Sequence, residues 1–307
     1  MRPSEQIIEE LLKDVENPVI AFLPYKAAMW DCMEPLYLEC IDRGIEADLI
    51  PLDYMTFPGG VFHNEKRDFN GLGYNTYDSE MIRDKKYDFM VIHYPYDGFN
   101  NVTKLYPDNF TWELKRLSKV VYIPYHGNIE SESWSRFFKM PGSRESDYIC
   151  LGSQFDVDVF KKTVPDYSGK IIQTEYSTKV ESAKDWEPVV VDEYEHPITL
   201  ICGTLWTFTH EPEERMEKHL KIIEKAKKES KTVIYRPHPL VYEAIAVMRP
   251  EYLKKYEEFL GKVEELCFLD KNQDLHIKIA LADKLYCDPS SVQRTWEGTG
   301  KPYEVIE

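Results

Sequence analysis

A guanidinium and an imidazole stand close together after a short apolar run in the second half of the chain. The run Thr232–Tyr235 is typical of a buried strand, and the motif Arg236-Pro237-His238-Pro239 follows it directly. The two prolines exclude a helix and a continued sheet ladder, so Arg236 and His238 are expected to be held rigidly at the carboxyl end of that strand. In open α/β sheets ligands bind at this end, and both side chains suit an anion. The alternative is a proline-rich turn whose side chains only face solvent.

Two further strand ends in the second half carry groups that can bind phosphate. Gly203 and Thr204 follow one apolar run, and Asp288-Pro289-Ser290-Ser291 follows another. A helix is predicted to begin close to these residues, and the unpaired N–H groups at a helix amino end favour an anion. The hydroxyls of Thr204, Ser290 and Ser291 can donate further hydrogen bonds to phosphate oxygens. Simple N-capping by the two serines is the alternative.

The first half of the chain has a comparable strand end. An apolar run there leads into Tyr125-His126-Gly127, and a histidine held in this way can act as a general base. Lys26, Trp30 and Asp31 follow the first predicted strand and are expected to lie near the same sheet edge. We therefore predict that these three residues contact an acceptor substrate.

Other potentially reactive residues fit ordinary structural roles better. Asp156 and Asp158 have the Asp-x-Asp spacing of some metal sites, but they begin a predicted helix, where acidic residues complement the dipole. His93 ends a strand and is interpreted as a core or rim histidine. The remaining histidines lack metal-ligand spacing, and the sequence has no Walker A, GxGxxG or nucleophile-elbow motif. No metal site is predicted.

The elements that position these residues alternate between strand and helix. In the first half, strands are predicted at 18–24, 47–52, 87–94, 119–127, 147–153 and 170–173, with helices at 32–43 and 109–118. In the second half, strands are predicted at 198–202, 232–235, 263–269, 282–288 and 301–306, with helices at 212–230, 241–260, 274–281 and 292–297. This order is typical of α/β domains with parallel sheets.

Two stretches interrupt the alternation. Residues 53–80 are rich in Gly, Asn, Asp and aromatic residues without a clear period, and are expected to form an irregular excursion over the sheet edge. Residues 177–197 lose hydrophobic periodicity and are interpreted as a domain boundary. We predict an amino-terminal domain at 1–180 on the acceptor side and a carboxyl-terminal domain at 198–307 on the donor side.

Composition limits the partners and the location. The net charge of −16, from 38 basic and 54 acidic residues, argues against nucleic acid as a partner and weakens any case for direct binding to an anionic membrane. Six scattered cysteines without a CxxC motif indicate buried thiols in a reducing compartment. No signal peptide or transmembrane segment is evident. We expect a cytoplasmic protein with at most peripheral association at the inner face of the membrane.

Together these motifs resemble the CDP-glycerol glycerophosphotransferase family of teichoic-acid synthesis (teichoic-acid polymerases and primases). The resemblance spans residues 119–302 and rests on His126-Gly127, Arg236-Pro237-His238-Pro239, Asp288 with Ser290-Ser291, and Gly300-Lys301-Pro302. Tyr125 stands where the family has tryptophan, Asn128-Ile129 where it has Thr-Pro, and Pro289 where it has tyrosine.

The resemblance implies a GT-B-like α/β fold, in which two Rossmann-like domains face a central cleft. It implies that His126 removes the proton of the acceptor hydroxyl, with Gly127 beside it, and that His238 and Arg236 hold the donor phosphates. The predicted donor site is completed by Gly203, Thr204, Asp288, Ser290 and Ser291. No cofactor and no metal are expected, since the CDP-activated donor is a substrate.

The predicted function is transfer of a glycerophosphate-type (polyol phosphate) group from a CDP-activated donor. The acceptor is expected to be a hydroxyl of a cell-wall, teichoic-acid or capsule precursor, lipid-linked precursors included. Two alternatives stay open: a GT-B glycosyltransferase that uses a nucleotide sugar, and a catalytically idle homologue that binds a nucleotide.

Overall fold

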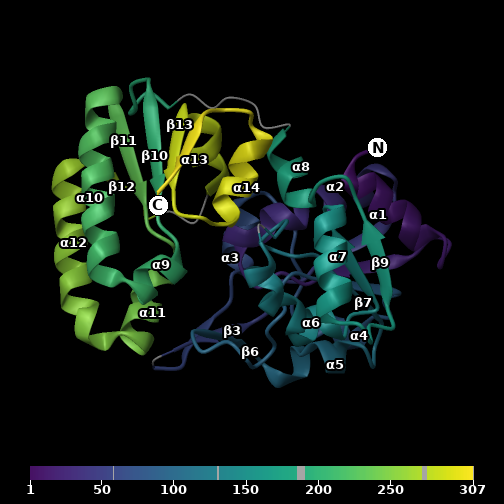
Figure 1. Cartoon of the computed structure of the whole chain (residues 1–307). Coiled ribbons are helices and arrows are strands. Elements are labelled where there is room, and N and C mark those ends of the chain that lie inside the picture. The colour runs from purple at the N-terminus through teal and green to yellow at the C-terminus, as the bar shows by residue number, and fades with distance from the viewer. Residues whose placement is uncertain (58, 130, 185–190, 272–274, 307) are drawn as a thin grey trace. The chain divides into compact units, whose positions relative to one another are not determined.

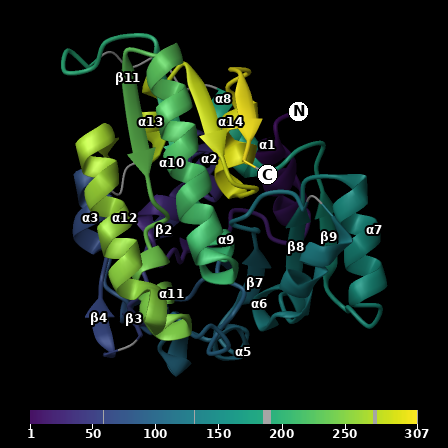
Figure 2. The ribbon, with the colours of Figure 1, turned by 60° about the vertical axis from the view of Figure 1, so that its left-hand side comes forward.

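The chain forms two compact α/β units. The computed structural model describes residues 1–306 with the exception of 58, 130, 185–190 and 272–274. The first unit comprises Met1–Thr56 and Gly60–Ser182, and the second comprises Phe57–Gly59 and Ala183–Glu307. Figures 1 and 2 show the ribbon from two sides.

The first unit is built on a parallel sheet in the order β2-β1-β5-β7-β8-β9. Its strands are β2 (Glu46–Leu49), β1 (Val19–Phe22), β5 (Phe89–Ile92), β7 (Lys119–Tyr122), β8 (Tyr148–Leu151) and β9 (Lys170–Gln173). Its main helices are α1 (Pro3–Leu12), α2 (Glu34–Asp42), α5 (Thr111–Leu114), α6 (Pro141–Arg144), α7 (Gln154–Thr163) and α8 (Thr178–Lys184). Two 3₁₀ helices, η1 (Ala27–Cys32) and η3 (Glu132–Lys139), follow β1 and β7.

The central strands of this sheet are buried on both faces, which explains their uninterrupted apolar sequences. Alternate side chains enter different cores: Ala21, Met90, Val120 and Ile149 in one, Phe22, Val91, Val121 and Cys150 in the other. The carboxyl ends of the strands are thereby fixed in position on a rigid layer.

The excursion at 53–80 is more regular than its sequence indicated. It forms a small antiparallel sheet in the order β4-β3-β6, with β3 (Tyr54–Thr56), β4 (Val61–His63) and β6 (Thr103–Leu105), and it continues into α3 (Lys66–Gly71). The prediction of an irregular stretch was wrong because these strands have three residues each, too few to show a period of two. The strand β6, about 40 residues further along, completes the sheet.

The second unit has a parallel sheet in the order β12-β11-β10-β13-β14. Its strands are β12 (Phe268–Leu269), β11 (Thr232–Arg236), β10 (Ile198–Cys202), β13 (Lys284–Cys287) and β14 (Tyr303–Val305). Its helices are α9 (Leu205–His210), α10 (Pro212–Glu229), α11 (Val241–Met248), α12 (Leu253–Leu266), α13 (Leu275–Leu281) and α14 (Ser291–Gly298). Helices α10 and α12 cover one face of the sheet, and α13 and α14 cover the other (Figure 1).

The predicted strand at 263–269 was mostly wrong, since α12 continues to Leu266. Tyr256, Phe259 and Val263 are buried along one side of this helix, at the spacing of helical turns. Only Phe268 and Leu269 remain for β12. The helix predicted at 241–260 is divided, because Pro250 cannot continue the hydrogen bonding of α11.

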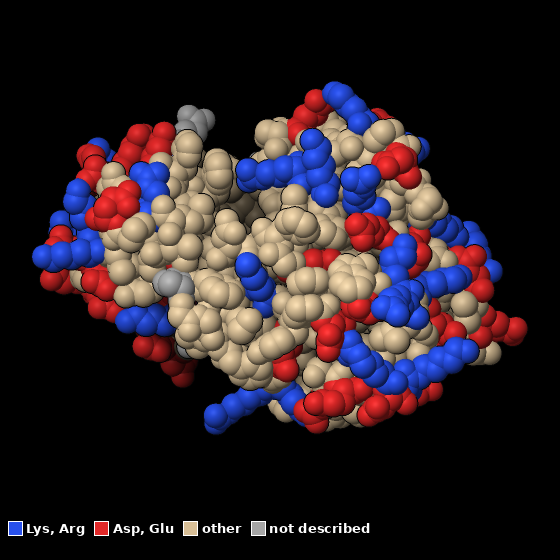
Figure 3. All heavy atoms as spheres, turned by 90° about the horizontal axis from the view of Figure 1, so that it is seen from below, with Lys and Arg blue, Asp and Glu red and all other residues tan. Residues whose placement is uncertain are grey.

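Among the described residues, no helix is long and apolar enough to cross a lipid bilayer. On the face shown in Figure 3, basic side chains are interspersed with acidic ones.

Candidate functional site

Three neighbouring strands of the second sheet end at the same level. Cys202, the last residue of β10, is paired with Arg236 on β11 and with Cys287 on β13. The turns that follow these strands therefore lie side by side along one sheet edge, which we call the donor edge. It contains Gly203, Thr204, Arg236, His238, Asp288, Ser290 and Ser291. The structure thus brings the predicted donor-site residues together, whereas their contact with a ligand stays a prediction.

Asp288 is the internal anchor of the donor edge. It is fully buried and accepts hydrogen bonds from Thr204 N (2.8 Å), Thr207 Oγ1 (2.6 Å) and Arg215 Nη1 (3.0 Å). His219 Nε2 lies 3.2 Å from Asp288 Oδ1, the oxygen that also accepts from Arg215. Burial alone would raise the pKa of Asp288, but the interactions with His219 and the other donors outweigh it and hold the pKa below its usual value. The carboxylate therefore ties the turn after β10 to the end of β13.

The glycine in that turn is required by close packing. A Cβ atom on Gly203 would lie 2.8 Å from Phe208 Cε2, 3.2 Å from the Tyr235 hydroxyl and 3.3 Å from His219 Cε1. Any larger residue would push the turn away from Asp288. Close packing alone therefore explains the glycine at position 203, whether or not a phosphate binds there.

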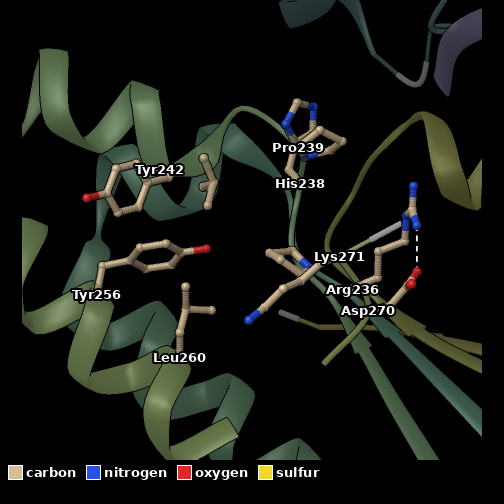
Figure 4. Close-up of a pocket in the computed structure, with 10 residues that line it drawn as sticks. Arg236, His238, Pro239, Tyr242, Tyr256, Leu260, Asp270 and Lys271 are labelled. Carbon is tan, nitrogen blue, oxygen red and sulfur yellow. Dashed lines mark hydrogen bonds and ion pairs between the residues drawn. The ribbon is translucent and has the colours of Figure 1, made fainter. Parts of the chain in front are cut away.

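Arg236 is buried with a counter-charge beside it. Only 5% of the residue is exposed, and its Nη1 donates to Asp270 Oδ2 at 2.5 Å (Figure 4). Asp270 follows β12 directly, and Lys278 Nζ lies 4.0 Å from its other oxygen. This pairing fixes the guanidinium and balances its charge. Asp270 was not among the predicted site residues, although an acidic residue at a fourth strand end was a usable signal.

His238 is held in one tautomer by its own turn. Its Nδ1 accepts a hydrogen bond from Leu240 N at 3.1 Å, so the neutral ring carries its proton on Nε2. The residue is half-buried, and its ring turns away from the Arg236–Asp270 pair (Figure 4). His238 therefore presents a hydrogen-bond donor, which suits a phosphate oxygen.

The serines after β13 stand at the amino end of α14. Ser290 is the N-cap residue with an extended backbone, but its side chain makes no capping hydrogen bond. Both Ser290 and Ser291 are half-buried. The hydroxyl of Ser290 is therefore not used for capping, which separates this position from the simple N-cap alternative.

In the first unit, His126 lies in an aromatic environment after β7. The Phe137 ring packs obliquely on the His126 ring, with 5.0 Å between the ring centroids. Tyr125 and Trp134 pack edge-on against it, with centroid distances of 5.5 and 6.4 Å. The histidine is 2% exposed, and neither ring nitrogen has a hydrogen-bond partner among the described residues. Burial lowers the pKa of His126 to about 4. Its imidazole is therefore neutral at pH 7 and has both nitrogens unused by the described fold.

The three predicted acceptor-side residues lie in the interior of the first unit. Lys26 Nζ contacts the Tyr54 hydroxyl at 2.8 Å and Glu65 Oε1 at 3.3 Å. Trp30 is buried in an aromatic cluster, and Asp31 forms a fully buried ion pair with Lys179. Each side chain has a visible structural role, and contact with an acceptor stays a prediction.

His93 and Asp156, for which the sequence indicated structural roles, have such roles in the first unit. His93 is fully buried, and its Nε2 accepts a hydrogen bond from the backbone N–H of Tyr25. Its ring stacks on the Tyr25 ring with 5.4 Å between the ring centroids. Burial lowers the pKa of His93 to about 3. Asp156 accepts a hydrogen bond from Ile129 N at 2.8 Å and one from the N-cap residue Ser153.

Comparisons with known proteins give matches only at the level of structure. No protein-family model and no curated protein matches the sequence. The UDP-bound structure of MnaA from S. aureus is 12% identical, with a TM-score of 0.60 over 94% of this chain and 79% of that chain. The Methanocaldococcus jannaschii UDP-GlcNAc 2-epimerase, in complex with UDP-GlcNAc and UDP, is 12% identical, with a TM-score of 0.59 over 94% and 83%. The wall teichoic acid polymerase TagF, also 12% identical, matches 98% of this chain and 73% of that chain with a TM-score of 0.49, too low to support an argument.

At such identities the similarity defines the fold. The chain has the predicted GT-B-like α/β fold with two Rossmann-like domains, which confirms the predicted fold class. The central cleft depends on how the domains are placed and stays a prediction. Membership in the CDP-glycerol glycerophosphotransferase family belongs to the proposal below.

Proposed function

We propose that this protein transfers a glycerophosphate-type group from a CDP-activated donor to a hydroxyl of a cell-wall or capsule precursor. The donor edge supports the proposal, because His238, Thr204 and Ser290 follow three adjacent strands and lie along the same edge of the second sheet. Such an edge combines fixed donors with a helix amino end, as diphosphate binding requires.

In this proposal the donor edge holds the diphosphate. His238 donates from Nε2, and the hydroxyls of Ser290 and Ser291 donate at the amino end of α14. Arg236 contributes through a charge shared with Asp270, so we expect it mainly to keep the turn after β11 in place. Thr204 is fixed by Asp288 in the same way. No metal or cofactor takes part.

The transfer step is a displacement at phosphorus. The acceptor hydroxyl attacks the phosphorus that bears the glycerol, the bond from this phosphorus to the bridging oxygen breaks, and CMP leaves. His126 takes the hydroxyl proton on a ring nitrogen. A base with a pKa of about 4 accepts a proton poorly at pH 7, so the proposal requires the bound acceptor to change the surroundings of His126 and raise that pKa.

A nucleotide-sugar donor is the second candidate. It is favoured by the first two structures above, one of which holds UDP and the other UDP-GlcNAc with UDP. Thermal-shift titrations with CDP-glycerol, another CDP-polyol, UDP-GlcNAc and a GDP-sugar separate the two candidates. We expect the CDP-polyols to raise the melting temperature most, and a larger shift with UDP-GlcNAc would favour the sugar donor.

The decisive test is turnover. The wild-type protein with CDP-glycerol and a polyol-phosphate or saccharide acceptor is expected to release CMP together with a lengthened acceptor, measured by chromatography. Binding of CDP-glycerol without CMP release from any acceptor tested would identify an idle homologue and overturn the transferase proposal.

A further inference from the structure

The turn that carries His126 is held by two backbone hydrogen bonds of different reach. Inside the turn, Gly127 N donates to Pro124 O at 3.0 Å, and Gly127 has a φ of 71°, a left-handed conformation that suits glycine. Two residues later, Ile129 N donates to Asp156 Oδ1 at 2.8 Å. The first bond is local, whereas the second joins the turn after β7 to the first turn of α7, 27 residues further along the chain.

Asp156 is itself fixed at the amino end of α7. The residue is 2% exposed, and its Oδ2 accepts a hydrogen bond from the hydroxyl of Ser153, the N-cap residue, at 2.7 Å. In return, the backbone N–H of Asp156 donates to Ser153 Oγ at 3.0 Å. Capping the helix in this way uses only one oxygen of the carboxylate. The other oxygen binds the turn that carries His126.

The turn after β8 packs closely against the same segment. A Cβ atom on Gly152 would overlap Asn128 Oδ1 and would lie 2.6 Å from Ser177 N, so glycine leaves the room that Asn128 occupies. Asn128 Nδ2 donates to Gly152 O at 3.4 Å, a long and therefore weak hydrogen bond. The bond from Ile129 to Asp156 is the shorter of these two links, and we expect it to be the stronger.

The position of the His126 imidazole depends on the backbone of its turn. Neither ring nitrogen has a hydrogen-bond partner among the described residues, so the ring is held by packing against Tyr125, Trp134 and Phe137. A general base must lie within about 2.6–3.2 Å of the group whose proton it takes. A misplacement of about 1 Å can cost about 10²-fold in rate. Whatever fixes the turn after β7 therefore bears on proton transfer.

We propose that Asp156 is a positioning residue for His126: by accepting the hydrogen bond of Ile129 N, it holds the turn after β7 where the imidazole can meet the acceptor hydroxyl. The inference rests on the proposed function, in which His126 takes the acceptor proton. In this role Asp156 acts through the backbone and not on the reacting atoms. Asp158, the second acid of the Asp-x-Asp pair, is exposed on the same helix and takes no part.

The first test measures CMP release by the full chain from CDP-glycerol and a polyol-phosphate or saccharide acceptor. Asp156→Ala should lower kcat about 10- to 100-fold, whereas the affinity for CDP-glycerol, proposed to bind the other unit, should stay the same. Asp156→Asn keeps an oxygen that can accept from Ile129 N and should restore most of the activity. Asp158→Ala is the matched control and should behave like the wild type.

A double variant separates positioning from a general loss of structure. If Asp156 acts through His126, adding Asp156→Ala to His126→Ala should lower kcat by less than about twofold, because the group that it positions is already gone. A further fall of about tenfold would show that Asp156 only supports the fold, and the inference would be overturned. Ser153→Ala removes the cap of α7 but not the bond to Ile129, so it should lower the melting temperature and leave kcat unchanged.

NMR of the His126 ring separates a failure of this inference from a failure of the proposed function. The ring lies among three aromatic rings, whose ring currents make its chemical shifts sensitive to small displacements. Asp156→Ala and Asp156→Glu should shift the His126 signals, and Asp158→Ala should not. Asp156→Glu lengthens the side chain but completes a Ser-x-x-Glu capping box with Ser153, so it should stay folded even if Asp156→Ala does not.

Unshifted His126 signals in the folded Asp156 variants would overturn the inference, whatever their turnover. Shifted signals together with an unchanged kcat would also overturn it, because the displaced turn would then not matter for proton transfer. If the wild type releases no CMP from any acceptor tested, the proposed function falls, and this inference falls with it.

Discussion

The two sheet edges differ in the charge state of the side chains buried there. After β5 and β7 in the first unit, His93 and His126 are buried, and their pKa values are lowered to about 3 and about 4, so both are neutral. In the second unit, Arg236 at the end of β11 and Asp288 just after β13 are buried as ions, each beside opposite charge. The two histidines after β5 and β7 are thus kept neutral, although Asp31 and Lys179 form a buried ion pair in the same unit, whereas Arg236 and Asp288 are kept charged in fixed positions.

The difference indicates which chemistry each edge can support. A neutral imidazole in an aromatic environment can accept a proton once its surroundings become more polar, but it carries no positive charge to balance that of an anion. Paired ions fix the turns of the donor edge, where His238 and Ser290 supply neutral hydrogen-bond donors to the proposed phosphate site. Under the proposed function, proton transfer belongs to the first unit and anion binding to the second, and the following experiments test that division.

The largest effect is expected from His126. His126→Ala should lower CMP release about 10²- to 10⁴-fold, the usual contribution of a general base, because the variant loses the imidazole that is proposed to take the proton. Binding of CDP-glycerol should stay as in the wild type, since the donor lies on the other unit. The surface variant His210→Ala, measured in the same assay, serves as the control. Unchanged turnover in His126→Ala would remove proton transfer from the first edge.

Asp288 should matter most for folding. Asp288→Ala leaves the buried Arg215 guanidinium without its counter-charge, and breaking a buried pair in this way costs about 3–5 kcal/mol. Hydrogen exchange followed by mass spectrometry should show faster exchange in β10 and β13 of this variant. The exposed pair of Asp166 with Arg144 supplies the contrast, because Asp166→Ala should leave exchange in the first unit almost unchanged.

If Asp288→Ala lost protection from hydrogen exchange only in α14, while β10 and Thr204 stayed protected, the carboxylate would not join the two strand ends.

The contrast between the edges also predicts different responses to acid. His93 and His126 take up protons more readily when unfolded, so the first unit loses stability as the pH falls below the ordinary histidine pKa of 6.5. Asp97 opposes this, because burial raises its pKa to about 6 and its folded form gains a proton over part of the same range. Near pH 5 the unfolded first unit binds about one proton more, equivalent to roughly 1.4 kcal/mol per pH unit.

The second unit should respond only in stronger acid. The pKa of Asp288 is lowered, so its contribution is complete above the ordinary value of 3.8 and is lost as the pH falls below it. Urea unfolding at pH 7.5 and pH 5 should therefore move the transition of the first unit and leave that of the second. The double variant His93→Gln/His126→Gln should reverse the direction of the shift, because the raised pKa of Asp97 remains, and an unchanged loss of stability at pH 5 would mean that other groups cause it.

The sequence predicted strand ends better than it predicted the residues that support them. Strand runs such as Ile198–Cys202 were found because parallel strands buried on both faces are continuously apolar. The motifs at Arg236 and Asp288 were visible for the same reason, since they interrupt such runs. Arg215 and His219 were missed because their partner Asp288 lies 73 and 69 residues away, and no local pattern records a hydrogen bond over such a separation.

Burial was equally hard to predict for polar residues. Lys26 and Asp31 looked available because charged residues are usually exposed, but each has a buried counter-charge from a distant segment, Glu65 and Lys179 respectively. The small sheet at β3, β4 and β6 supplies the environment that encloses Lys26, and no periodicity in its short strands indicated this sheet.

Ser290→Ala should have the smallest effect and separates binding from folding most cleanly. Its hydroxyl makes no capping bond, so its loss should leave the melting temperature within about 1 °C of the wild type, unlike an ordinary N-cap whose removal costs about 1 kcal/mol. If the hydroxyl donates to a donor phosphate, CDP-glycerol should bind about five- to tenfold more weakly, as measured by calorimetry. The matched variant Ser230→Ala, after α10, should leave affinity unchanged. A fall in melting temperature without a loss of affinity would mean that Ser290 only caps α14, and the donor edge would then depend on His238 and the backbone of that helix.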